Sequence, residues 1–157
     1  MESILCLSDY NRKQDLKQAW GGWLSTLATW DWWVTLTFRD LETSLDAPNW
    51  TKPGWGYTGH AWDRFVKELG ETKGLHDLSW VRGREYQHWR GVPHFHGLIG
   101  GVQDLRRDEA WSWWFQRYGI ARIEPYNREL GAGYYLCKYV TKELGDIQFS
   151  AGLQRND

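Results

Sequence analysis

The stretch SWVRGREYQHWRGVPHFHGLIG, residues 79–100, is the part of the chain that decides its fold. Residues 79–87 and 93–100 are rich in the aromatic and aliphatic side chains typical of strands, and residues 88–92 read as a short polar turn. The pattern predicts an antiparallel β-hairpin. Because alternate residues of a strand point to the same face, His94 and His96 should project together.

A carboxylate is expected across this turn from the histidine pair. If the turn centres on residues 89–90, Glu85 stands opposite His94, with Cβ atoms about 4.5–5.5 Å apart. Two imidazoles and one carboxylate can bind a divalent ion and leave positions open for a phosphate and water. Gln87 and His88 are the alternative third ligands, because the assignment of Glu85 depends on the register of the hairpin.

The segments around the hairpin predict an α+β fold of the ferredoxin-like, split βαβ kind. Helices are expected at 9–29, 58–69, 104–118 and 127–144, and strands at 32–38, 79–87, 93–100 and 120–124. The order predicts an antiparallel central sheet with helices on one face and an extra N-terminal helix. Residues 39–57 read as a long irregular loop, and the polar tail after residue 146 reads as a frayed end.

Composition indicates a globular, intracellular protein but does not identify its partner. The 157 residues, 41% of them hydrophobic, suit one domain with a core of its own. There is no apolar run of the ~20 residues that span a bilayer, no basic start typical of a secretory signal and no CxxC pair. The formal net charge is -1, although residues 80–142 carry an excess of Lys and Arg.

A second chemical cue is the segment GYYLCKYVTK, residues 133–142. In a helix, the spacing i, i+3, i+4, i+7 places four of its side chains on one face: Tyr135, Lys138, Tyr139 and Lys142. Such a pattern on its own is more often a solvated face. Beside a metal-binding hairpin, however, tyrosine nucleophiles and phosphate-stabilising lysines suit the transesterification of a phosphodiester.

Three segments together resemble the HUH endonucleases, specifically the rolling-circle replication initiator (Rep) proteins. Residues 34–38 look like motif I of that family, residues 94–96 like its His-hydrophobe-His motif II, and residues 135–142 like its Tyr-x-x-Lys-Tyr-x-x-Lys motif III. The motifs stand in the family's order. Because no Gly-x-x-x-x-Gly-Lys-Ser/Thr loop follows them, we expect residues 1–157 to be a single nickase domain without a fused helicase.

The resemblance implies a metal-dependent enzyme that nicks and rejoins single-stranded DNA at a replication origin. His94, His96 and Glu85 would hold Mg²⁺ or Mn²⁺, which polarises the scissile phosphate. A motif III tyrosine would attack and form a covalent 5′-phosphotyrosine. Both Tyr135 and Tyr139 are candidates, with Tyr135 as the first choice, and Lys138 or Lys142 would stabilise the phosphate.

The same resemblance implies the partners and the setting. The substrate would be single-stranded DNA or an origin hairpin, with a host helicase and polymerase completing replication, inside a host cell that carries a phage, virus or plasmid. Contacts to DNA are expected at Thr35, Thr37, Arg82, Arg84, Trp89 and Arg90.

Several other functions fit parts of the pattern. A one-tyrosine HUH transposase also places its tyrosine after the histidines. A plasmid relaxase carries its tyrosine near the N-terminus, where this chain has only Tyr10 in a polar segment. An RRM-like, non-catalytic nucleic-acid-binding module shares the sheet plan, but its RNP signature is not visible here. A hydrolase that uses metal-activated water is a further alternative.

Overall fold

The structure is a computed structural model that describes residues 2–42, 50–72, 74, 78–132, 134–135 and 146–153. Its main sheet contains β1 (Trp32–Leu36), β4 (Ser79–Tyr86), β5 (Pro93–Gly100), β6 (Ala121–Pro125) and β7 (Asp146–Phe149). The helices are α1 (Glu2–Leu27), α2 (Trp55–Thr72) and α3 (Arg107–Arg117), followed by the 3-10 turn η1 (Ala151–Leu153). Two short strands, β2 (Leu41–Glu42) and β3 (Trp50–Thr51), pair with each other.

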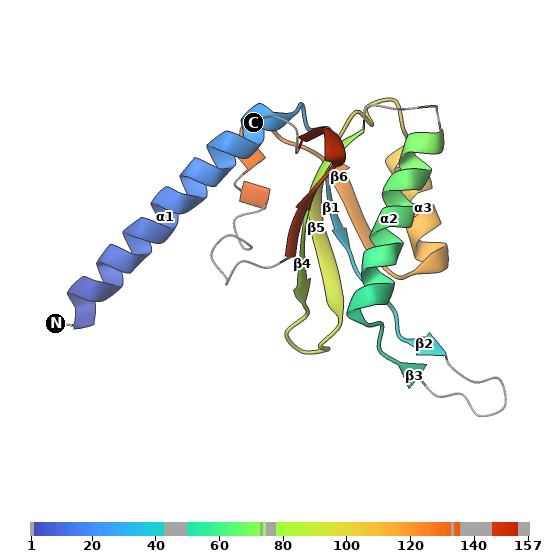
Figure 1. Ribbon diagram of the computed structural model, residues 1–157, viewed down its shortest axis with the longest axis horizontal. Helices are drawn as coiled ribbons and strands as arrows, with labels where there is room; N and C mark the ends of the chain where they lie inside the picture. The colour runs from blue at the N-terminus through green and yellow to red at the C-terminus, as the bar shows by residue number, and fades with distance from the viewer. Residues whose placement is uncertain are drawn as a thin grey trace.

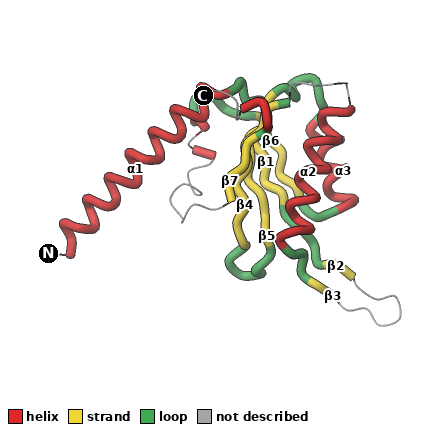
Figure 2. Tube along the Cα trace, viewed as in Figure 1, coloured by secondary structure: helices red, strands yellow, loops and turns green. Residues whose placement is uncertain are grey.

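The main sheet is antiparallel throughout and has the strand order β6-β1-β5-β4-β7. Without β7, the order is fourth, first, third, second along the chain, which is the ferredoxin-like arrangement predicted from the sequence. Helix α2 precedes β4 and helix α3 connects β5 to β6, and both cover the same face of the sheet (Figures 1 and 2). The α+β prediction is therefore confirmed.

The principal core lies between this face and the two helices. Alternate residues of β1 point into it because the strand is pleated, and α2 and α3 contribute large aromatic rings from their inner faces. Its most buried members include Val34, Leu36, Trp62, Phe65, Phe95 and Trp114.

A smaller cluster forms on the opposite face, where only the C-terminal part of α1 reaches the sheet. Leu24 is buried there with Val81 and Leu98, and the indole of Trp30 donates a hydrogen bond of 2.9 Å to the carbonyl oxygen of Leu24. The rest of α1 extends away from the sheet (Figure 1). The helix begins at Glu2, several residues earlier than predicted. None of the described helices is long and apolar enough to cross a membrane.

The C-terminal part differs from the sequence prediction. Residues 146–149, expected to fray, form β7 and pair with β4 from Arg84↔Asp146 to Val81↔Phe149. Alternation in this short strand explains the difference, because Ile147 and Phe149 join the smaller cluster while the polar residues face buried arginines. Of the helix predicted at 127–144, residues 131–132 and 134–135 are helical, and 136–145 lie outside the described residues.

Candidate metal centre

The β4–β5 hairpin has the register that the metal prediction requires. Glu85 pairs with His94, and Gly83 pairs with His96. The turn closes through a hydrogen bond of 2.8 Å from the amide of Gln87 to the carbonyl oxygen of Val92. Gly91 adopts a φ of 64° within this turn, a conformation that glycine adopts at little cost. The predicted position of Glu85 opposite His94 is confirmed.

The three side chains meet on the sheet face opposite α2 and α3. His94 Nε2 lies 3.3 Å from Glu85 Oε1, and the ring centroids of His94 and His96 are 4.8 Å apart. One ligand atom from each residue can be chosen so that all three lie within 4.8 Å of one another. Within the described part of the chain, no other three His, Cys, Asp or Glu side chains form such a group.

The donor set fits a divalent cation. Two imidazole nitrogens and one carboxylate bind divalent metals at about 2.0–2.2 Å, so modest side-chain movement would bring the three residues around one ion. The side chains of His94 and Glu85 are 11% and 23% exposed, which leaves the group partly open to solvent. An ion held here would therefore keep coordination positions accessible to a substrate phosphate.

A hydroxyl group also contacts the histidine pair. Thr35 in β1 pairs with His96 in β5, and its Oγ1 lies 3.2 Å from Nδ1 of His96. The sequence analysis assigned Thr35 to DNA contact and gave no sign of this hydrogen bond, because the bond depends on which strand lies beside β5.

Two of the predicted DNA contacts need correction. Arg82 and Arg84 alternate with Glu85 along β4 and point to the opposite face of the sheet, where they are only 2% and 7% exposed. Both bind the carboxylate of Asp146, at 2.8 and 2.7 Å, and the guanidinium of Arg84 lies 3.7 Å from the ring centre of Trp55. These arginines therefore stabilise the fold and do not face the metal group.

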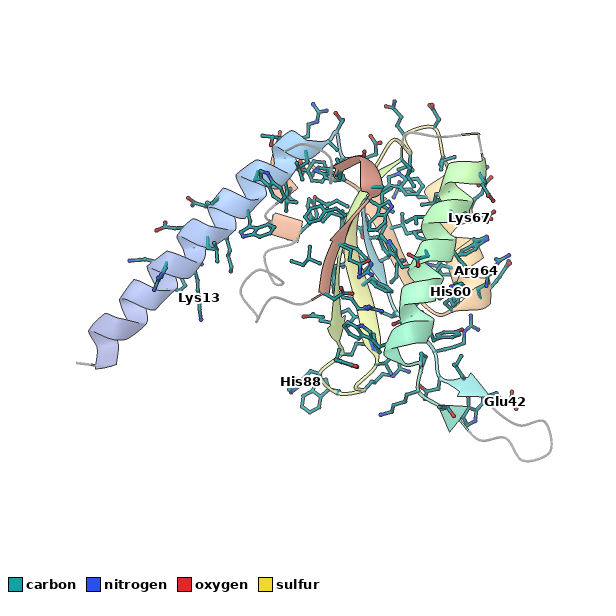
Figure 3. All side chains as sticks on the ribbon, viewed as in Figure 1. Lys13, Glu42, His60, Arg64, Lys67 and His88 are labelled. Carbon is teal, nitrogen blue, oxygen red and sulfur yellow. The ribbon has the colours of Figure 1, made fainter. Side chains whose placement is uncertain are left out.

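The other predicted contacts are nearer to solvent. Trp89 is 92% exposed in the hairpin turn, and Thr37 donates a hydrogen bond of 2.8 Å to the carbonyl oxygen of Ile120. Arg90 forms an ion pair of 2.6 Å with Asp40. His88, an alternative third ligand, is exposed in the same turn (Figure 3) and does not belong to the three-residue group.

Tyr135 is half-buried and packed. Its ring stacks on Trp33 with centroids 5.3 Å apart, and its hydroxyl accepts a hydrogen bond of 3.0 Å from the amide of Asn127. Asn127 follows β6 just beyond the pairing of Trp32 with Pro125. The other motif residues, Lys138, Tyr139 and Lys142, lie outside the described residues.

Comparison with protein families adds independent information. The family model described as Replication-associated protein ORF2 matches residues 31–144, which is more than half of the chain and includes β1 and the whole hairpin. The chain belongs to this family. Its members are replication-associated proteins, and membership indicates a role in replication initiation. No curated protein and no solved structure matches the chain significantly.

Proposed function

We propose that this replication-associated protein is a metal-dependent endonuclease of the HUH type, which nicks single-stranded DNA at a replication origin and rejoins it. The observation that carries the proposal is the group of Glu85, His94 and His96 on one face of a hairpin. Family membership supports the setting, since a replication initiator must expose a 3′-hydroxyl from which synthesis can begin.

In this proposal the three residues hold Mg²⁺ or Mn²⁺, which supplies Lewis-acid polarisation of the scissile phosphate when bound. The paired strands β4 and β5 fix the spacing of Glu85 and His94. The contact with Thr35 limits the rotation of the His96 ring. Partial burial restricts water around the group while one side remains open to the DNA backbone.

The covalent step would be a transesterification at phosphorus. The phenolic oxygen of a tyrosine forms a bond to the phosphorus, the bond from phosphorus to the 3′ oxygen breaks, and the DNA 5′ end remains as a phosphotyrosine. The phenolic proton passes to solvent or to a base, and the departing 3′ oxygen takes up a proton to become a hydroxyl. Attack by a 3′-hydroxyl on the phosphotyrosine reverses the reaction and rejoins the strand. Lys138 or Lys142 would stabilise the phosphate charge.

The contacts of Tyr135 favour Tyr139 as the nucleophile. The hydroxyl of Tyr135 accepts a hydrogen bond from Asn127, and its ring is stacked on Trp33, which pairs with Leu98 and not with a histidine. Using this hydroxyl in catalysis would require breaking a packed contact. We therefore assign the attack to Tyr139 and a packing role to Tyr135.

A covalent-adduct assay tests the proposal. The protein is mixed with a pool of single-stranded oligonucleotides and Mn²⁺, with and without EDTA, and separated on a denaturing gel. We expect a shifted band that requires Mn²⁺ and disappears in His96→Ala and in Tyr139→Phe. The band should persist in Tyr135→Phe, because the aromatic ring that packs on Trp33 is retained.

Other results would change the assignment. Loss of the band in Tyr135→Phe as well as in Tyr139→Phe would indicate that both tyrosines are needed. Binding of oligonucleotides without Mn²⁺, together with no adduct in a diverse pool, would exclude nicking and favour a non-catalytic binding module.

A further inference from the structure

Two threonines on the same face of β1 make different contacts. Thr35 Oγ1 lies 3.2 Å from His96 Nδ1, whereas the hydroxyl of Thr37 donates to the carbonyl oxygen of Ile120 at 2.8 Å. Both residues are half-buried. Only the first of these contacts reaches a residue of the metal group.

We propose that Thr35 is a positioning residue for the metal centre, which accepts a hydrogen bond from Nδ1–H of His96 and so presents Nε2 to the ion. This inference rests on the metal site of the proposed function. A neutral imidazole carries one proton, so a proton held on Nδ1 leaves Nε2 with the lone pair that coordination requires. Hydrogen bonds of this kind fix the tautomer and orientation of histidines that bind metals.

The pairing of β1 with β5 makes this contact a built feature of the sheet. Thr35 and His96 are register partners, so the backbone hydrogen bonds on both sides hold their side chains next to each other. Glu85 orients the other histidine from the opposite strand, through its contact with His94. The site thus receives one orienting contact from each strand that flanks β5.

Metal affinity is the first test. Thr35→Val keeps the β-branched shape that suits a strand but removes the hydroxyl, and we expect it to bind Mn²⁺ about 10–100-fold more weakly than the wild type. Thr35→Ser restores a hydroxyl and should bind Mn²⁺ close to wild-type strength. Thr37→Val is the matched control, because it removes the neighbouring hydroxyl on the same strand and should leave Mn²⁺ affinity unchanged.

The tautomer of His96 gives a second readout that does not depend on metal or DNA. Long-range ¹H–¹⁵N spectra of the metal-free protein, at a pH where the imidazole is neutral, distinguish a proton on Nδ1 from one on Nε2. We expect the Nδ1–H form in the wild type, Thr35→Ser and Thr37→Val, and a shift toward the Nε2–H form in Thr35→Val. The His96 signals are assigned by their loss in His96→Ala.

Opposite results would overturn the inference. Wild-type Mn²⁺ affinity in Thr35→Val, or an Nε2–H tautomer in the wild type, would exclude the positioning role. Failure of the proposed function is separable: absence of a DNA adduct, with both Thr35 effects present, would exclude nicking while the role of Thr35 stands.

Discussion

His94 and His96 are two residues apart on β5, and each has a different polar neighbour at the residue scale. The carboxylate of Glu85 lies 3.3 Å from His94, and the hydroxyl of Thr35 lies 3.2 Å from His96. A carboxylate can join the histidines as a ligand, while a hydroxyl can orient a ring without entering the coordination shell. The chemistry of the site therefore depends on side chains from three adjacent strands.

Metal binding should stabilise the folded protein, because the ligand group exists only when β4 and β5 pair. With Mn²⁺ at about 100 times its dissociation constant, the free energy of unfolding should rise by about 2.7 kcal/mol. His94→Ala removes one ligand and should abolish most of the resulting increase in Tm, measured by thermal unfolding with and without Mn²⁺. His88→Ala is the control, since His88 lies outside the ligand group. An equal loss in His88→Ala would contradict the assigned ligands.

At the scale of the element, β7 is held by charge as well as by strand pairing. Asp146 binds Arg82 and Arg84 on β4, and Arg82 is only 2% exposed. Removing the carboxylate leaves a buried cation without its counter-charge. We expect Asp146→Ala to lower the free energy of unfolding by about 3–5 kcal/mol, measured by urea denaturation. Gln148→Ala removes only a neutral partner of Arg82 and should cost less. An equal cost for the two variants would argue against the role of charge.

The same ion pair gives a pH dependence. Burial alone would raise the pKa of Asp146, but the hydrogen bonds and charges of Arg82 and Arg84 outweigh burial and hold the pKa below its ordinary value. A lowered pKa in the folded state stabilises the protein above the unfolded-state pKa of about 3.9, and this stabilisation is lost as the pH falls through the folded-state pKa. The stability difference between the wild type and Asp146→Asn should therefore shrink below about pH 4, as measured by urea denaturation at a series of pH values. A difference that stays constant there would contradict this account.

Helix α2 approaches β5 most closely at a glycine. A Cβ atom on Gly97 would lie 2.8 Å from the ring of Trp62 and 3.0 Å from the carbonyl oxygen of Val81. Gly97→Ala should therefore destabilise the fold by about 1–3 kcal/mol. Gly56→Ala, in the first turn of α2, meets nothing within 4 Å and should be neutral or stabilising. Denaturant unfolding of both variants measures the difference, and equal stabilities would show that Trp62 moves aside without cost.

At the scale of the whole molecule, the sheet separates structural from chemical functions. The large core and both covering helices lie on one face, and the histidine pair lies on the other, beside the smaller cluster that receives the end of α1. Most of α1 projects from the domain, with Lys13 on the projecting part (Figures 1 and 3). The attachment of α1 therefore depends on a few buried residues near its C-terminal end.

Truncation of α1 side chains should show this unequal dependence. Leu24→Ala removes a side chain that is 2% exposed and should cost about 2–5 kcal/mol of unfolding free energy. Tyr10→Ala, on the projecting part and 59% exposed, should change stability by no more than about 0.5 kcal/mol. Urea denaturation of both variants measures the contrast. A large cost for Tyr10→Ala would mean that the projecting part packs against something in solution.

Much of the candidate site followed from local patterns. The turn composition and the alternation of residues 93–100 were enough to predict the hairpin, its register and the shared face of His94 and His96, because these depend on neighbours in sequence. Arg82 and Arg84 were misjudged as DNA contacts, since their charge suggested solvent and their partner, Asp146, is distant in sequence. The polar tail was misjudged for the same reason.

The sequence by itself determined the α+β class, the order of the four central strands and a carboxylate opposite the first histidine. Local periodicity and turn chemistry encode these features. Only the tertiary structure decided that β7 adds to the edge of the sheet, that Thr35 contacts His96 and that Tyr135 packs on Trp33. These contacts join segments far apart in the chain, and their free energy comes from burial and charge pairing that exist only after the strands have assembled.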